Sequence, residues 1–263
     1  MPDSSAAEPR PIDGSRVLVA GGTSSVGLAA ARQFAEAGAD RIVLVGRDAG
    51  RGEKAKAEVA AKGAEVHFLS GDAGDAVDST RLAADAADFL DGRLDTFVSA
   101  VSASGHLGPI DNQDAAVLEQ MLVGLVLPVM QMNRAIIPYM QQGGGTIVNI
   151  SSDAAKVPTP GEAVIGGAMA AITMFSRTLA LEVKRYGIRV HAVTPSLVAD
   201  TPLAQRLLSE EFGAKIFGRI RAKALLGLPD AEDVAETILW LASPSAAKVT
   251  GQVISVNGGI SAG

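Results

Sequence analysis

The chain has 263 residues, of which 48% are hydrophobic, and its formal net charge is −6 at pH 7. This apolar content is enough to bury a core, which excludes a mainly disordered chain, and the acidic balance argues against a generally basic nucleic-acid-binding protein. The sequence has no cysteine and three histidines, which excludes disulfides and thiol nucleophiles. We therefore expect no metal site and no nucleic-acid partner, and the absence of cysteine favours the cytoplasm.

Neither a targeting segment nor a membrane span is expected. The first residues are small, polar and proline-bearing, which predicts a disordered tail over 1–11 and not a signal peptide. The longest apolar run, Met121–Met130, is interrupted by Gly124 and Pro128. A helix needs about 20 apolar residues to cross a bilayer, so we expect no membrane partner.

Short β-branched runs alternate with longer amphipathic segments along the chain. The expected strands are 16–20, 41–45, 66–69, 96–100, 146–150, 188–193 and 253–256. The expected helices are 27–37, 51–62, 80–90, 115–140, 162–185 and 231–242. Strands that are apolar on both faces predict a buried parallel sheet with helices on both sides. We therefore expect an α/β fold with a doubly wound parallel sheet in one domain over 12–263.

A glycine-rich turn follows the first expected strand and leads directly into a helix. It reads Ala20-Gly-Gly-Thr-Ser-Ser-Val-Gly27. Glycines let backbone N–H groups approach a pyrophosphate, and the N-terminus of the next helix adds partial positive charge. The position of the turn favours a nucleotide site over an ordinary turn. The expected contacts are Gly21, Thr23, Ser24, Ser25, Val26 and Gly27.

With this turn, the chain resembles the short-chain dehydrogenase/reductase family over nearly its whole length. The family pattern Thr-Gly-x-x-x-Gly-x-Gly occurs with Ala20 in place of Thr and Ser25 in place of the middle Gly. Three further segments are similar to the family's fifth strand, sixth strand and C-terminal region, namely Gly145–Ser152, Tyr186–Pro195 and Val249–Gly259. The resemblance implies a Rossmann-type domain, a NAD(P)(H) site and a substrate lid at about 202–225.

The end of the second strand bears on the choice of cofactor. An acidic residue there favours NAD, whereas a basic residue pairs with the 2′-phosphate of NADP. Gly46 stands where the acid would be and Arg47 follows it, so we expect NADP over NAD, the alternative being an ordinary surface arginine. By the resemblance, Asp72 and Ala73 contact the adenine and Val198 contacts the nicotinamide amide. The alternative role of Asp72 is to form a turn.

The family's catalytic positions are where this chain departs from the pattern. The family protonates the alkoxide from the Tyr of Tyr-x-x-x-Lys, with a Ser that orients the carbonyl and an Asn that holds a water. Here Ile165 stands for the Tyr and Met169 for the Lys, and neither can hold a proton at neutral pH. The Asn aligns with Gly124, or with Leu125 if the register moves by one. Ser152 survives at the family's spacing, although a strand-end serine that caps the backbone would look the same.

No other tyrosine rescues the motif. Tyr139 and Tyr186 both lack a lysine four residues later, so a shift of register does not restore the pair. The remaining candidates for proton donation near the expected pocket are Ser104, His106, Ser151, Asp153 and Glu162. Among these, His106 also fits an exposed loop histidine, and Glu162 also fits a helix cap.

The lid segment carries an apolar stripe and several cations. The stripe comprises Leu207, Leu208, Phe212, Ile216, Phe217 and Ile220. The cations are Arg206, Lys215, Arg219, Arg221 and Lys223. The stripe fits either ordinary packing or a bulky apolar substrate, and the cations fit either a solvated face or an anionic ligand.

Three functions are compatible with these observations. The first is a pseudoenzyme, a non-catalytic or weakly active subunit of a dehydrogenase/reductase assembly. It would associate through its fourth and fifth helices with a second copy or with an intact member of the family. The second is an active NADPH-dependent reductase that uses Ser152, His106 or water. The third is non-redox chemistry or ligand sensing on the same fold.

Overall fold

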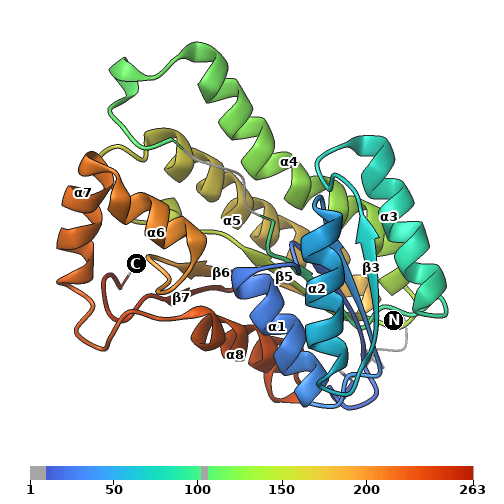
Figure 1. The fold of residues 1–263 in the computed structure, drawn as a ribbon. Coiled ribbons are helices and arrows are strands. Elements are labelled where there is room, and N and C mark those ends of the chain that lie inside the picture. The colour runs from blue at the N-terminus through green and yellow to red at the C-terminus, as the bar shows by residue number, and fades with distance from the viewer. Residues whose placement is uncertain (1–9, 102–105, 263) are drawn as a thin grey trace.

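The computed structural model describes residues 10–101 and 106–262. A seven-stranded parallel sheet in the order β3-β2-β1-β4-β5-β6-β7 forms its centre (Figure 1). Its strands are β1 Arg16–Ala20, β2 Arg41–Gly46, β3 Glu65–Ser70, β4 Thr96–Ser99, β5 Gly145–Ile150, β6 Ile188–Pro195 and β7 Val253–Val256. The winding reverses between β3 and β4, so β1 and β4 open a crevice at their carboxyl ends. The expected doubly wound α/β fold is confirmed.

Helices cover both faces of the sheet. They are α1 Ser25–Glu36, α2 Ala49–Ala60, α3 Ala76–Phe89, α4 Ala115–Met140, α5 Ala163–Val183, α6 Pro202–Ser209, α7 Glu211–Arg221 and α8 Ala231–Ala242. Short 3-10 helices are η1 Ile110–Asn112, η2 Asp153–Ala155, η3 Lys184–Tyr186 and η4 Pro244–Ala246. α1, α2 and α8 pack on one face of the sheet, and α3, α4 and α5 on the other.

The two cores follow from the alternation of side chains along each strand. In β1, Val17 and Val19 join the cluster under α1 and α8, whereas Leu18 joins the cluster under α3, α4 and α5. Because both faces are covered, the strand interiors are mainly apolar, which is why the sequence pattern located the strands. Buried polar residues such as Asn149 and His191 are exceptions.

One expected element differs in the structure, and two expected positions lie partly or wholly outside the described residues. The lid at about 202–225 is divided into α6 and α7, with extended backbone at Glu210 between them. The disordered tail expected over 1–11 lies mostly outside the described residues, and so does Ser104.

Two helical segments, Ala115–Met140 and Ala163–Tyr186, are long and apolar enough to cross a membrane, with mean hydropathies of 1.6 and 1.5 in their most apolar stretches. Core helices pass the same test, so these segments are weak evidence of a span. Only 28% and 39% of those stretches are buried. An apolar face of α4 and α5 is therefore exposed.

Candidate functional site

The turn after β1 brings three backbone segments into close approach. Gly21 has a φ of +78°, and a Cβ there would lie 2.5 Å from the carbonyl oxygen of Ala100. A Cβ at Gly27 would lie 2.3 Å from the carbonyl oxygen of Gly21. Only glycine fits at these two positions. The turn, the segment after β4 and the start of α1 therefore pack backbone against backbone, which is the close packing that a dinucleotide-binding turn requires.

The start of α1 is open to an anion. Ser25 has a φ of +49°, the left-handed conformation that favours glycine, and the family pattern has a glycine at this position. Ser24 is the N-cap residue, yet among the described residues its side chain makes no capping hydrogen bond, and the first turn of α1 has no acidic residue. The first N–H groups of the helix thus lack a side-chain acceptor. These residues fit the pyrophosphate of a dinucleotide.

The residues expected around the adenosine half lie at the ends of β2 and β3. Arg47 is exposed directly after β2. A Cβ at Gly46 would meet the Thr23 side chain at 2.7 Å, so Gly46 lets the phosphate turn lie against β2. The carboxylate of Asp72 accepts a hydrogen bond of 2.8 Å from the backbone N–H of Gly74. Asp72 therefore forms a turn, which was the alternative to the expected adenine contact.

An apolar cluster lies between α4 and α5, where the family resemblance places the proton relay. Met121, Leu125 and Ala168 are buried there, and Ile165 and Met169 pack against them. Leu125, one of the two positions considered for the family's Asn, is thus in the same cluster as the residues at the Tyr and Lys positions. None of these side chains can hold a proton at neutral pH.

Both tyrosines lie elsewhere. Tyr139 and Tyr186 pack against the core cluster beneath α3, α4 and α5, not against the cluster of Ile165 and Met169. The Arg185 guanidinium lies over the Tyr186 ring at 4.8 Å from its centroid.

Two serines at the end of β5 have structural partners. The Ser152 Oγ accepts a hydrogen bond of 3.2 Å from the backbone N–H of Ala154 and caps η2, as expected for a strand-end serine. The Ser151 Oγ donates a 2.9 Å hydrogen bond to the carbonyl oxygen of Met169, which fastens β5 to α5. Ser152 lies thirteen residues before Ile165 in sequence, and its hydroxyl serves here as the cap of η2.

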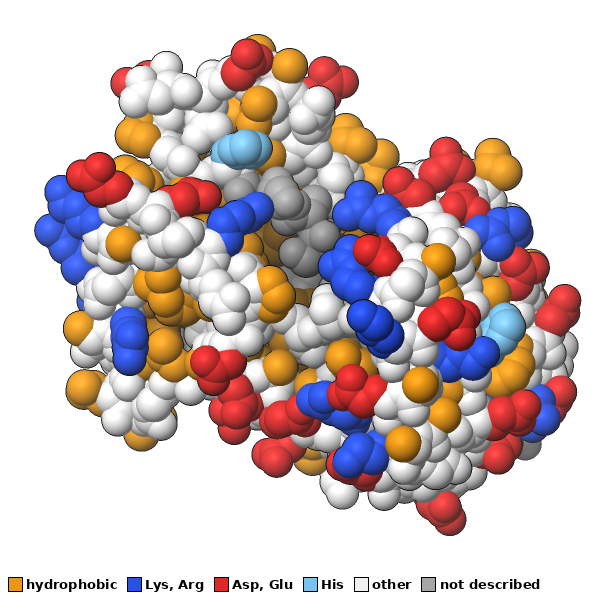
Figure 2. Space-filling view, viewed as in Figure 1, with side chains coloured by type: hydrophobic (Ala, Val, Ile, Leu, Met, Phe, Trp, Pro, Cys, Tyr) orange, Lys and Arg blue, Asp and Glu red, His pale blue; other side chains and the backbone are white. Residues whose placement is uncertain are grey.

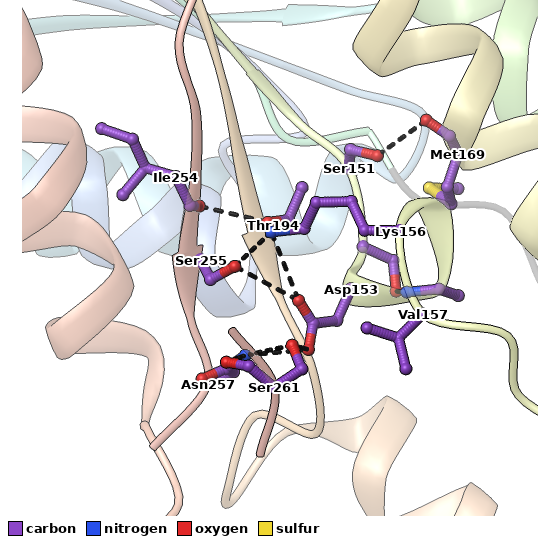
Figure 3. Close-up of polar contacts among 12 residues, drawn as sticks. Ser151, Asp153, Lys156, Val157, Met169, Thr194, Ile254, Ser255, Asn257 and Ser261 are labelled. Atoms are coloured by element: carbon purple, nitrogen blue, oxygen red, sulfur yellow. Dashed lines mark hydrogen bonds and ion pairs between the residues drawn. The ribbon is translucent and has the colours of Figure 1, made fainter. Parts of the chain in front are cut away.

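Asp153 is the centre of a buried polar network that sequence reasoning missed (Figure 3). Its Oδ2 accepts hydrogen bonds from Asn257 Nδ2 at 2.8 Å and from Ser261 Oγ at 2.6 Å. The Lys156 ammonium lies 3.7 Å from Oδ1 and donates to the Ser255 hydroxyl. Asp153 is therefore committed to holding η2 against β7 and the C-terminal segment. Partners more than 100 residues apart in sequence leave no local signal of such a network.

Glu162 is the candidate acid with the most unusual surroundings. It is the N-cap residue of α5, three residues before Ile165. Burial raises the pKa of Glu162, and a hydrogen bond with Thr159 opposes this shift in part. Within the described residues it forms no ion pair. Phe212 of α7 covers the neighbouring Gly161, where a Cβ would lie 2.4 Å from the ring. His106, by contrast, is exposed.

The loop after β6 and the lid are mainly packed against each other. Thr201 donates a 3.0 Å hydrogen bond to the carbonyl oxygen of Val198, and its Oγ1 caps α6. Leu207 and Phe217 from the apolar stripe are buried in a small cluster of their own. The part of the chain that the structure describes holds no group of three or more acidic or histidine side chains suited to a metal.

Comparison with known proteins gives a consistent result over almost the whole chain. The family model described as enoyl-(acyl carrier protein) reductase matches residues 20–261. The chain is 31% identical over 248 residues to 2-(S)-hydroxypropyl-CoM dehydrogenase 3 of Xanthobacter autotrophicus, covering 94% of this chain and 96% of the relative. It is 30% identical over 251 residues to human dehydrogenase/reductase SDR family member 4, covering 95% and 88%. A solved short-chain type dehydrogenase/reductase from Mycobacterium ulcerans superposes with a TM-score of 0.87 at 26% identity, covering 94% and 90%.

Proposed function

This chain belongs to the short-chain dehydrogenase/reductase family, whose members typically bind NAD or NADP, and we propose that it is an NADP(H)-binding, non-catalytic or weakly active subunit of a dehydrogenase/reductase assembly. The observation that carries the proposal is the packing of Leu125, Ile165 and Met169 into one apolar cluster. A bound nicotinamide cofactor supplies hydride, and the chain must then supply a proton to the developing alkoxide. Hydrocarbon and thioether side chains cannot do so.

Turnover by the purified chain tests this proposal directly. We expect NADPH oxidation close to background with a panel of ketones and enones. The Leu125→Asn/Ile165→Tyr/Met169→Lys variant, which restores the family's groups, should reduce ketones faster than the unmodified chain. Rapid ketone reduction by the unmodified chain alone would overturn the proposal.

Arg47 supports NADP over NAD. A guanidinium binds phosphate through charge-assisted hydrogen bonds, and β2 ends without a carboxylate that would bind the ribose hydroxyls. We expect Arg47→Ala to weaken NADPH binding by about tenfold or more and to leave NADH binding unchanged. Calorimetric titration measures both, with the exposed Lys54→Ala as control. Equal affinity for both nucleotides would exclude the NADP preference, and binding of neither would exclude a working nucleotide site.

The exposed face of α4 and α5 supports an oligomer. Its large apolar side chains are 36% to 64% exposed, namely Leu122, Val123, Leu127, Met174 and Leu181. We propose that a second copy or an intact member of the family covers this face. Met174→Glu/Leu181→Glu should then give a smaller species by light scattering, whereas Val77→Glu, on exposed α3 surface, should not. An unchanged mass for the double variant would exclude this interface.

A second function, an active reductase with a replaced proton donor, is favoured by Glu162. A carboxyl group with a raised pKa stays protonated to higher pH than an ordinary glutamic acid. It would donate its proton to the substrate oxygen while the substrate carbon receives hydride, and solvent would then reprotonate the carboxylate. This acid lies one helical turn before the position of the family's tyrosine.

The two functions make different predictions for Glu162→Gln, because the variant leaves turnover unchanged at background if the chain is non-catalytic. If Glu162 is the acid, the variant loses turnover but keeps its NADPH affinity, and the rate of the unmodified chain falls as pH rises through the raised pKa. Glu119→Gln, an exposed carboxyl on α4, is the matched control. Turnover that survives Glu162→Gln would exclude Glu162 as the donor.

A further inference from the structure

α7 and the turn after it combine exposed cations with exposed leucines. Lys215, Arg219, Arg221 and Lys223 are all exposed. In Figure 2, Lys and Arg side chains gather at the left edge of the view, over α7, with hydrophobic side chains below them. The chain as a whole has a net charge of −6, so this concentration of positive charge is local.

These four cations lack ion-pair partners among the described residues. Elsewhere in the described part of the chain, seven arginines are paired with carboxylates, namely Arg10, Arg16, Arg32, Arg41, Arg51, Arg81 and Arg93. The carboxylates that flank the segment in sequence are Glu210 and Glu211, at the far end of α7, and Asp230, which caps α8. The four cations are therefore available to an anion outside the chain.

Leu225 and Leu226 follow the last of these cations and are 89% and 86% exposed, more than any other large hydrophobic residue described. Single exposed leucines are ordinary, but two adjacent ones beside unpaired cations form an amphipathic surface.

The turn that carries the leucines is held by backbone contacts. The Leu226 N–H donates a 3.1 Å hydrogen bond to the carbonyl oxygen of Gly258, and a Cβ at Gly258 would lie 1.8 Å from the carbonyl oxygen of Gly227. Gly258 follows Asn257, which Asp153 holds in the buried network (Figure 3). The leucines therefore project from an anchored turn. Binding through them has a small entropic cost because the turn is already ordered.

From this combination we propose that the face from Lys215 to Leu226, here called the basic leucine face, binds the surface of an anionic lipid membrane. Cations beside apolar side chains favour such a surface because the cations meet lipid phosphates while the leucines enter the acyl boundary. A symmetric contact between two copies through this face would bring four cations against four cations, which disfavours it. The expectation of no membrane partner rested on the absence of a membrane-spanning helix. The proposed contact is with the membrane surface and needs no such helix.

Vesicle co-sedimentation of the full chain tests the proposal. The chain should bind vesicles of phosphatidylcholine with phosphatidylglycerol, should not bind phosphatidylcholine alone, and should dissociate as salt is raised. Leu225→Ser/Leu226→Ser and Arg219→Glu/Lys223→Glu should each lower the partition coefficient by about tenfold or more. Lys54→Glu/Lys248→Glu makes the same charge change on exposed sites elsewhere and should retain binding.

Three results would overturn the proposal. One is equal binding, or no binding, to neutral and anionic vesicles. Another is binding that survives the leucine changes and is competed by poly-glutamate, which would indicate an acidic protein partner. The third is a lower oligomer mass for the leucine variant of a chain that does not bind vesicles, which would indicate a subunit contact. Circular dichroism establishes that each variant is folded.

Discussion

Asp153 and Lys156 form an ion pair with little access to water, since their side chains are 6% and 14% exposed. Removing one partner of such a pair leaves the other charge buried without compensation. We expect Asp153→Asn to lower the free energy of unfolding by about 3 kcal/mol. Asp153→Asn/Lys156→Met should recover part of the loss, because the double change removes both charges.

Urea unfolding of the three proteins measures this effect. Asp111→Asn, at an exposed position, is the control and should change the free energy of unfolding by less than about 0.5 kcal/mol. If Asp153→Asn costs no more than this control, the network does not depend on its carboxylate.

Residue identity could be read from the sequence at the candidate site, but residue contacts could not. Ile165 and Met169 were located because the segment Phe175–Glu182 matches the family's helix and fixes the register, and Ser152 lies at the family's spacing before Ile165. The sequence left Gly124 and Leu125 as alternatives for one position, and burial of Leu125 with the other two is a fact of helix packing. The commitment of Asp153 to Asn257 and Ser261 was invisible for the same reason, because it depends on where β7 lies.

At the scale of elements, α1 packs closely against the phosphate turn because Gly27 has no side chain. A methyl group at Gly27 would collide with the carbonyl oxygen of Gly21 at 2.3 Å, and rigid backbone cannot give way as a flexible side chain would. We expect Gly27→Ala to cost about 2 kcal/mol of stability and to weaken NADPH binding. Gly218→Ala, which meets no atom within 4 Å in α7, should instead stabilise by up to about 1 kcal/mol. Thermal unfolding and calorimetric titration of both variants make the comparison, and equal stabilities would contradict it.

The elements most easily predicted were those with both a periodic pattern and a terminal signal. α4 was expected over 115–140, and Asp114 caps its start by accepting a 2.8 Å hydrogen bond from the N–H of Ala116. The start of α6 has such a signal, since Thr201 caps it and Pro202 follows directly. The boundary between α6 and α7 has none, because the apolar spacing continues past Glu210, where neither glycine nor proline marks an end.

For the molecule as a whole, β6 carries a buried base that bears on stability at low pH. His191 is fully buried, and neither ring nitrogen makes a hydrogen bond of normal geometry within the described residues. Burial, together with the nearby Arg189 guanidinium, lowers the pKa of His191 to about 4, and a backbone contact with Val249 opposes the shift. Arg189 itself, although its pKa is lowered to about 10 by burial, stays charged at neutral pH.

This shift makes the folded state less stable as the medium becomes acidic. Because the histidine pKa is lower in the folded chain than in the unfolded chain, the unfolded state binds more protons below about pH 6.5, and stability falls as pH falls through that value towards 4. Between pH 7 and pH 5 we expect His191 to remove about 2 kcal/mol from the free energy of unfolding. Urea unfolding of the unmodified chain across this range should therefore show a steeper pH dependence than that of His191→Leu, which has no proton to bind. Carboxylates titrate mostly below this window and are common to both proteins, so parallel curves would mean that His191 is not held neutral by its surroundings.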